Sequence, residues 1–302
     1  MPSVTSAAAW PVQAPFFLVL ASAILYALGG RRHAPGHRDP RERRRRSAAF
    51  YGGLAVILIA LDTPLDPLSD TLFTAHMTQH LLLLMVAPAL IVLSAPWLRL
   101  WQPLPLGFRR SVAKGVARGR WASPLRALAR LLARPLPAWV AFNGVLIAWH
   151  VPTLFDATLS NQAVHDLEHA TFLVGGLLFW LQVLDSPPVR ARLGYGLRAV
   201  YVTAALLVSW VLAVVLALSR SPFYGAYSSL AHRPGGLSAL ADQQLAGGMM
   251  WVPGSIPFTI ALLWLVLQAL GPQPRPPARA ADTTTTATTT NGSTATSAGQ
   301  RS

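Results

Sequence analysis

The sequence has no cysteine and few charged residues. The absence of cysteine excludes disulfides, thiolate metal sites, cysteine nucleophiles and covalently attached c-type haem. Charged residues make up only 12% of the 302 positions, whereas 53% are hydrophobic, and the mean hydropathy is +0.42. This composition is too apolar for an ordinary soluble domain of such length and indicates an integral membrane protein. Any metal must be held by histidine, methionine or carboxylate side chains.

Long apolar windows recur along most of the chain. A bilayer core about 30 Å thick needs roughly 20 mainly apolar residues per helix. Seven windows of this kind lie at about residues 12–29, 48–66, 74–97, 136–155, 164–184, 199–218 and 243–270. We therefore predict an all-α, polytopic integral membrane protein with a seven-helix transmembrane domain over residues 1–270. Residues 271–302 are rich in proline and threonine, and we expect a disordered cytoplasmic tail.

The basic residues are distributed asymmetrically around these windows. The net charge is +14, with an arginine-rich run at residues 41–46. All but Arg220 and Arg233 of the 25 basic residues follow the first, third, fifth or seventh predicted span, and therefore lie on one predicted side of the membrane. This positive-inside pattern places the N-terminus outside and the C-terminus in the cytoplasm. Topology and contact with anionic headgroups account for the charge, so we expect membrane lipid and not nucleic acid as a partner.

Histidines gather at the outer ends of the predicted spans. The motifs HMTQH and HDLEH place His76 and His80, and likewise His165 and His169, four residues apart, on one helix face. His150 closes the fourth predicted span at the same membrane level. Polar groups at the edge of the hydrocarbon are costly unless they pair or bind a ligand. We therefore predict that these five histidines form a metal-binding cluster, with uptake weakening as pH falls because neutral imidazole binds the metal.

Other polar and soft side chains lie near these histidines. Methionine is the softest ligand available in a chain without cysteine. Acidic residues in HDLEH fall off the face shared by the two histidines of that motif, so we expect them to orient neighbouring imidazoles or to attract cations. The supporting residues that we predict are Met77, Gln79, Asp156, Asp166, Glu168, Asp242, Gln243, Met249 and Met250.

Proline and paired glycines interrupt several predicted spans. We expect Pro88, Pro253 and Pro257 to kink their helices, because proline lacks a backbone donor. The pairs at 175–176 and 247–248 allow close helix approach.

Three strings occur in order on the predicted spans: HMTQHLLLLMVAPALIVLSAP, WHVPTLFDATLSNQAVHDLEHATFLVGGLLFWLQVLD and DQQLAGGMMWVPG. They resemble the CtaG family, the assembly factors of the caa-type cytochrome c oxidase of Bacillus, over about residues 50–268. The resemblance implies a role in maturing a haem–copper oxidase, with a copper ion supplied at the extracytoplasmic face of the bacterial plasma membrane. The family's polar motif residues correspond to His76, Gln79, His80, His150, Asp156, His165, Glu168, His169, Asp242 and Gln243.

The resemblance also implies oxidase subunits, and other copper chaperones, as partners of a protein that is not itself an enzyme. Three alternatives stay open at this point: a metal-free assembly scaffold, a haem-binding protein, and a seven-span zinc hydrolase.

Overall fold

The computed structural model describes residues 14–32 and 39–271, and within these ranges the regular structure is helical, with no β-strand. The long helices are α1 (Ala14–Arg32), α2 (Pro40–Leu61), α9 (Pro135–Trp149), α11 (Gln162–Val183), α12 (Tyr195–Ala217) and α14 (Ala239–Leu270). The third predicted span consists of α4 (Phe73–Leu81), a π-helical turn η1 (Leu82–Val86) and α5 (Ala87–Ser94). The shorter elements are α3 (Leu65–Ser69), α6 (Trp97–Trp101), α7 (Leu106–Arg118), α8 (Ser123–Leu132), α10 (Pro152–Ser160), α13 (Gly225–Ser228) and the 3-10 turn η2 (Pro234–Gly236). The predicted tail, beyond Gly271, lies outside the described residues.

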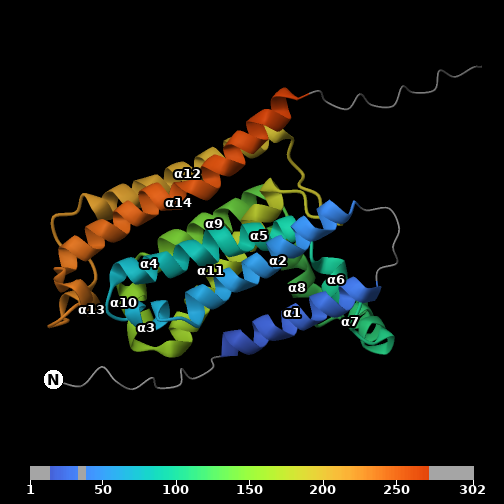
Figure 1. Cartoon of the computed structure of the whole chain (residues 1–302), viewed down its shortest axis with the longest axis horizontal. Helices are drawn as coiled ribbons and strands as arrows, with labels where there is room; N and C mark the ends of the chain where they lie inside the picture. Colours follow the sequence, from blue (N-terminus) through green and yellow to red (C-terminus); the bar gives the residue numbers. More distant parts are fainter. Residues whose placement is uncertain (1–13, 33–38, 272–302) are drawn as a thin grey trace, which may run out of the picture.

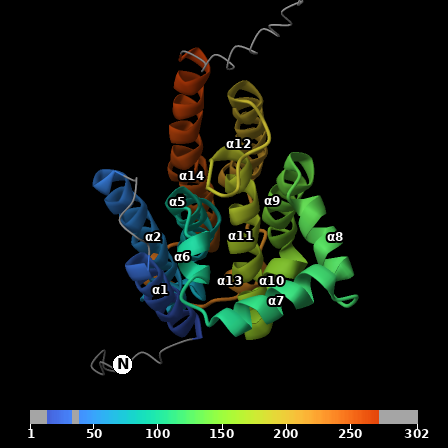
Figure 2. The same ribbon diagram turned by 90° about the vertical axis from the view of Figure 1, so that its right-hand side faces the viewer.

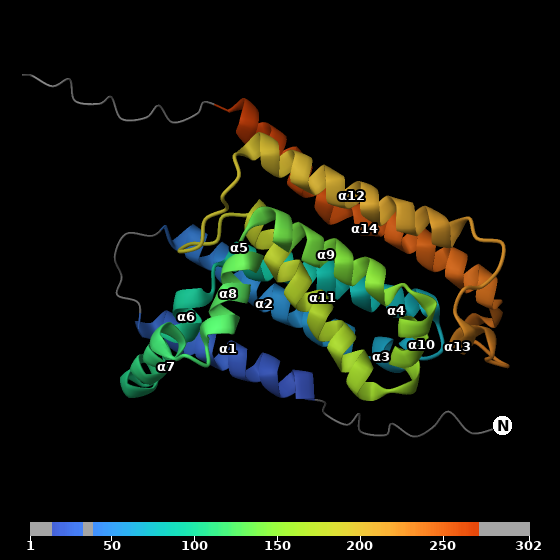
Figure 3. The same ribbon diagram turned by 180° about the vertical axis from the view of Figure 1, so that it is seen from behind.

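The helices form an elongated bundle with two different ends. Helices α12 and α14 run side by side along one flank, while α2, α4, α5, α9 and α11 form the middle and α1 lies on the opposite flank (Figure 1). The short helices α3, α10 and α13 gather at one end, and Figure 3 shows the same grouping from behind. Helices α6, α7 and α8 lie at the other end, which faces the viewer in Figure 2. The start of α4 and the basic connection between α5 and α9 therefore lie at opposite ends of the bundle.

Three segments among the described residues are long and apolar enough to cross a membrane: Phe73–Ser94, Tyr195–Ala217 and Ala239–Leu270. Helices α8 and α9 together also meet this condition, but the pair bends by 90° at the break between them. The other predicted spans lie on helices α1, α2 and α11. The all-helical class and the membrane-like helices are thus confirmed, while the number of spans and the orientation of the termini stay predictions.

Three of the long helices begin at a side chain that accepts from their own first turn. Asp39 caps α2, Asn161 caps α11 and Ser238 caps α14, each by accepting a backbone N–H two or three residues further on. Helix α4 differs, because its N-cap is Leu72, whose side chain carries no hydrogen-bonding atom. Its first N–H groups are instead bound by Asp242 of α14, so packing between distant segments determines where this helix begins.

Close helix contact occurs where the sequence places proline and glycine. Pro88 cannot donate to Leu84, and the chain there widens into the π-helical turn. Gly176 of α11 lies against this turn, and a Cβ atom added to it would lie 2.3 Å from the Leu84 carbonyl oxygen. A Cβ on Gly247 of α14 would lie 2.5 Å from the backbone nitrogen of Ala217 of α12. The predicted close approaches are confirmed at these two glycines, and α14 continues as one helix through both of its prolines.

Candidate metal centre

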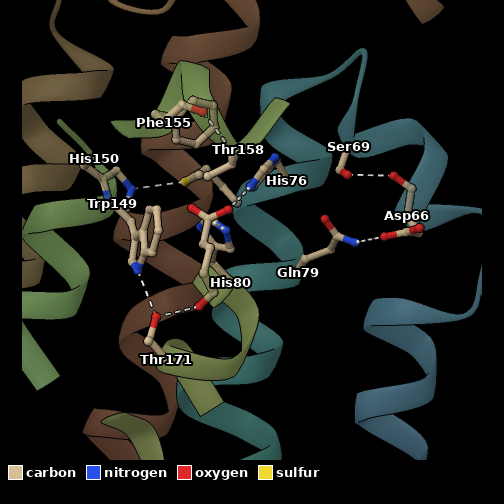
Figure 4. Close-up of polar contacts among 12 residues, drawn as sticks. Asp66, Ser69, His76, Gln79, His80, Trp149, His150, Phe155, Thr158 and Thr171 are labelled. Carbon is tan, nitrogen blue, oxygen red and sulfur yellow. Dashed lines mark hydrogen bonds and ion pairs between the residues drawn. The ribbon is translucent and has the colours of Figure 1, made fainter. Parts of the chain in front are cut away.

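Helices α4 and α11 bring four ligand-bearing side chains together near the end of the bundle that holds α3, α10 and α13. One ligand atom from each of His76, His80, Glu168 and His169 lies within 4.8 Å of the other three, and all four residues are buried. Glu168 is central: its Oε2 is 3.2 Å from Nε2 of His76 and its Oε1 is 3.4 Å from Nε2 of His80. Figure 4 shows the two imidazoles against a carboxylate. These four residues are called the buried cluster below.

Helical spacing explains which side chains of α11 face α4. The ring centroids of His165 and His169 are 4.2 Å apart, as expected for neighbours separated by one turn. Glu168 differs from the sequence-based expectation, because it lies three residues after His165 and therefore shares the inward face. Asp166 follows the expectation: it accepts a hydrogen bond from Gln162 in an exposed position away from the buried cluster.

A hydrogen bond from outside the two helices orients His76. The hydroxyl of Tyr227 donates its one proton to the backbone oxygen of Ser69, so it can only accept from Nδ1 of His76, 3.2 Å away. Nδ1 therefore carries the proton of the neutral ring, and the Nε2 lone pair points at Glu168. Two acceptors that face each other at 3.2 Å are unfavourable unless a cation, either a proton or a metal ion, lies between them. Metal-binding histidines commonly donate one ring N–H to a fixed oxygen atom, which leaves the other nitrogen free for the metal.

Several buried polar atoms around this position have no hydrogen-bond partner within the described residues. They are both ring nitrogens of His80, Nε2 of His165, Nε2 of His169 and Oε1 of Glu168, the last of which lies 3.4 Å from Nε2 of His80 without forming a hydrogen bond. Unpaired polar atoms in a protein interior each cost of the order of 1–3 kcal/mol. A metal ion bound by one nitrogen of His80, by His169 and by Glu168 would lower that cost, so the residues present fit a cation-binding site.

Aromatic side chains from α10 and from the segment around α13 cover one side of the buried cluster. The ring of Phe155 is 4.8 Å from that of His76 and 4.3 Å from that of Tyr224. Burial raises the pKa of the Tyr227 hydroxyl well above its usual value, so it stays protonated and donates as described. Asp156 accepts the first two backbone N–H groups of α13 and thereby holds both tyrosines in place. Tyr227 could not be predicted from the sequence, because a four-residue helix in a connection has no periodic pattern that reveals its contacts.

The remaining predicted histidines border the buried cluster. The ring of His165 is 5.2 Å from that of His76, but His165 is not one of the four residues whose ligand atoms converge. His150, at the end of α9, donates from Nδ1 to the backbone oxygen of Leu146 at 2.6 Å. Its Nε2 lies 3.2 Å from the sulfur of Met77, the contact drawn from His150 in Figure 4. Three of the five predicted histidines thus share one position and two flank it.

Three predicted supporting residues position the helices. Asp242 accepts the backbone N–H groups of Phe73 and Thr74 at 2.7 and 3.1 Å, which caps α4. Gln243 accepts from the connection before α13 and donates back to it. Gln79 donates to the end of α2 and to α3, and its bond to α3 is visible in Figure 4. These side chains hold the cluster-bearing elements together and do not belong to the converging ligand set.

The two methionines of α14, Met249 and Met250, lie further along the bundle than Asp242, the residue of α14 that caps α4. Asp242 lies beside the first residue of α4, and Gly254 lies against Leu81 at its end, since a Cβ there would be 3.0 Å from that side chain. This register places Met249 and Met250 at about the depth of the later turns of α4. Met250 is buried.

Comparison with known proteins identifies relatives of this chain. It is 24% identical to uncharacterised proteins of Mycobacterium bovis and Mycobacterium tuberculosis over 225 residues, and 22% identical to one of Mycobacterium leprae over 229 residues. Each match covers 74% of this chain and 34% of the relative, so the chain spans about a third of the length of these curated proteins. No solved structure matches it. Residues 24–271, which include the buried cluster, match the family described as cytochrome c oxidase caa3 assembly factor, and the chain therefore belongs to that family.

Proposed function

We propose that this protein takes up a copper ion at the extracytoplasmic face of the bacterial plasma membrane and supplies it to a caa3-type cytochrome c oxidase during assembly. Family membership supports the oxidase as the partner. The observation that carries the copper proposal is the buried cluster, in which ligand atoms of His76, His80, Glu168 and His169 converge within 4.8 Å. In this account the protein is a carrier and not an enzyme.

The chemistry of the buried cluster supports copper as cargo. Imidazole binds copper, zinc and iron well, and the chain offers methionine but no thiolate nearby. A tetrahedral ion with bonds of about 2 Å holds its ligand atoms roughly 3.3 Å apart. The ligand atoms here spread to 4.8 Å, so they must move inward on binding and outward on release. A site whose ligand atoms are not held at the spacing of a bound ion can release that ion readily, as a carrier must.

The proposed membrane arrangement has seven spans, with the N-terminus outside and the C-terminus in the cytoplasm. The bundle is consistent with this orientation, because the buried cluster and the basic helices α7 and α8 lie towards opposite ends. Positive charge favours the cytoplasmic side, which places the buried cluster towards the outer face. Oxidase subunits and other copper chaperones would then meet the protein from that side.

The test is the copper content of the oxidase in cells that lack the chromosomal copy of this protein. These cells receive one of three proteins: the wild type, the double variant His76→Ala, His80→Ala, or the control His232→Ala. The control alters an exposed histidine. We expect the wild type and the control to restore both oxidase subunits and their copper. The double variant should restore the subunits with less copper per haem, measured by mass spectrometry on purified oxidase.

The main alternative is a scaffold that holds oxidase subunits and handles no metal. Full copper loading of the oxidase by the double variant, at wild-type levels of the assembly factor in the membrane, would support the scaffold and contradict the carrier.

A further inference from the structure

We propose that Met77 and His150 form a second subsite, beside the buried cluster, that binds copper as the monovalent ion. The proposal rests on the proposed function only in naming copper as the cargo. The two residues come from α4 and from the end of α9, and neither belongs to the converging ligand set. Both are buried, and Met77 is fully so.

The hydrogen bond of His150 determines which atom faces the sulfur. A backbone carbonyl can only accept, so the 2.6 Å contact with Leu146 requires the proton on Nδ1. Nε2 of the neutral ring then carries a lone pair, and it lies 3.2 Å from Sδ of Met77. A thioether has no proton to donate. The contact therefore brings two electron-pair donors together.

A cation would make this contact favourable. A proton on Nε2 would turn His150 into an imidazolium ion, because Nδ1 already holds a proton, and a buried charge is costly without a partner. The buried carboxylate of Glu168 contacts His76 and His80 rather than His150. A metal ion would satisfy both lone pairs at once.

The spacing matches two ligands of one ion. With bonds of about 2.0 Å to nitrogen and about 2.3 Å to sulfur, a tetrahedral ion separates these two atoms by roughly 3.5 Å. The observed separation is 3.2 Å. The distance between Nε2 and Sδ is thus close to that of two ligands of one ion, whereas the ligand atoms of the buried cluster are up to 4.8 Å apart.

Ligand softness identifies the ion. Thioether sulfur favours copper(I), whereas zinc and other divalent ions prefer the imidazoles and carboxylate of the buried cluster. His80 lies between the two sites: its ring centroid is 6.3 Å from that of His150, and neither of its ring nitrogens has a hydrogen-bond partner among the described residues. It can therefore contribute to either site, and copper(I) can pass between them by ligand exchange with no change in oxidation state.

The experiment uses purified full-length protein in detergent, first loaded with Zn²⁺ to fill the buried cluster and then titrated with copper(I) under anaerobic, reducing conditions. X-ray absorption at the copper edge reports whether sulfur is bound. We expect the wild type to bind one copper(I) per chain with a sulfur ligand. Met77→Leu should keep its zinc but lose this copper, and His150→Gln should do the same. Met85→Leu, which alters another buried methionine two turns deeper, should behave as wild type.

Each result separates the subsite from the buried cluster. Retained zinc in the variants shows that the fold is intact. A copper–sulfur signal that persists in Met77→Leu, or wild-type protein that binds zinc but no sulfur-ligated copper(I), overturns the subsite and leaves the proposed function standing. Wild-type protein that binds neither ion contradicts both.

Discussion

Replacing Asp242 with asparagine tests whether this residue caps α4 or binds the metal. Its carboxylate is fully buried and accepts the N–H groups of Phe73 and Thr74 and the Thr74 hydroxyl, at 2.7, 3.1 and 2.6 Å. Asparagine offers one acceptor oxygen, and its amide NH₂ group would face one of these donors. Hydrogen bonds to a charged group contribute about 1.5–3 kcal/mol and neutral ones about 0.5–1.5 kcal/mol. With one donor left unpaired, we expect the free energy of unfolding to fall by about 3 kcal/mol.

This loss is large enough to measure by thermal unfolding in detergent, followed by tryptophan fluorescence. In chains of about 150–250 residues, 1 kcal/mol shifts the melting temperature by about 2–4 °C, so Asp242→Asn should lower it by roughly 6–12 °C. The control is Gln244→Ala, on the same turn of α14, which removes one exposed hydrogen bond to Ser219 and should cost about 0.5 kcal/mol or less.

A measurement of bound copper distinguishes the two possible roles of Asp242, as the cap of α4 or as a metal ligand. Below its melting temperature, Asp242→Asn should bind as much copper per chain as the wild type, because the residue lies outside the buried cluster. An unchanged melting temperature would refute the cap. Copper lost from protein that remains folded would place Asp242 among the ligands.

Three further predictions concern packing, ring orientation and pH. Gly176→Ala should lower the free energy of unfolding by about 1–3 kcal/mol, because its Cβ would meet the Leu84 oxygen, whereas Gly175→Ala, with its nearest neighbour at 3.8 Å, should be close to neutral in the same thermal assay. Tyr227→Phe removes the acceptor that keeps the proton on Nδ1 of His76, so metal affinity measured by competition with a chelator should fall about 10–100-fold. Copper affinity measured by equilibrium dialysis should decrease steadily as pH is lowered, since protons compete for imidazole nitrogen, and an affinity independent of pH would contradict histidine ligation.

The long helices could be placed from the sequence because apolar run length and charge clustering are local properties. The predicted window 164–184 corresponds to α11, and the window 199–218 corresponds to α12. The π-helical turn within the third window could not be predicted in detail. It depends on Pro88 together with Gly176, a residue from another helix that packs against it. The predicted window 136–155 begins close to the start of α9, but the 90° angle between α8 and α9 could not be predicted from the apolar pattern.

Only those features of the candidate site that depend on residue spacing within one helix could be predicted from the sequence. A spacing of four residues identified two histidine pairs. A residue three positions after the first histidine of a pair also lies on the same helix face, which explains why Glu168 belongs to the buried cluster. Tyr227 and Asp242 act across 151 and 168–169 residues of sequence, respectively, through contacts that exist only after the bundle has packed. Pattern in a single sequence carries no information about such pairings.

The most direct test of the central claim is the copper content of the purified full-length protein from copper-supplemented cells. Mass spectrometry would compare the wild type with Glu168→Gln, with the double variant His76→Ala, His80→Ala, and with the control His232→Ala. The account predicts near-stoichiometric copper in the wild type and the control, less in Glu168→Gln, and least in the double variant. Folded wild-type protein without copper, or a double variant that keeps its full complement, would contradict a metal site at the buried cluster.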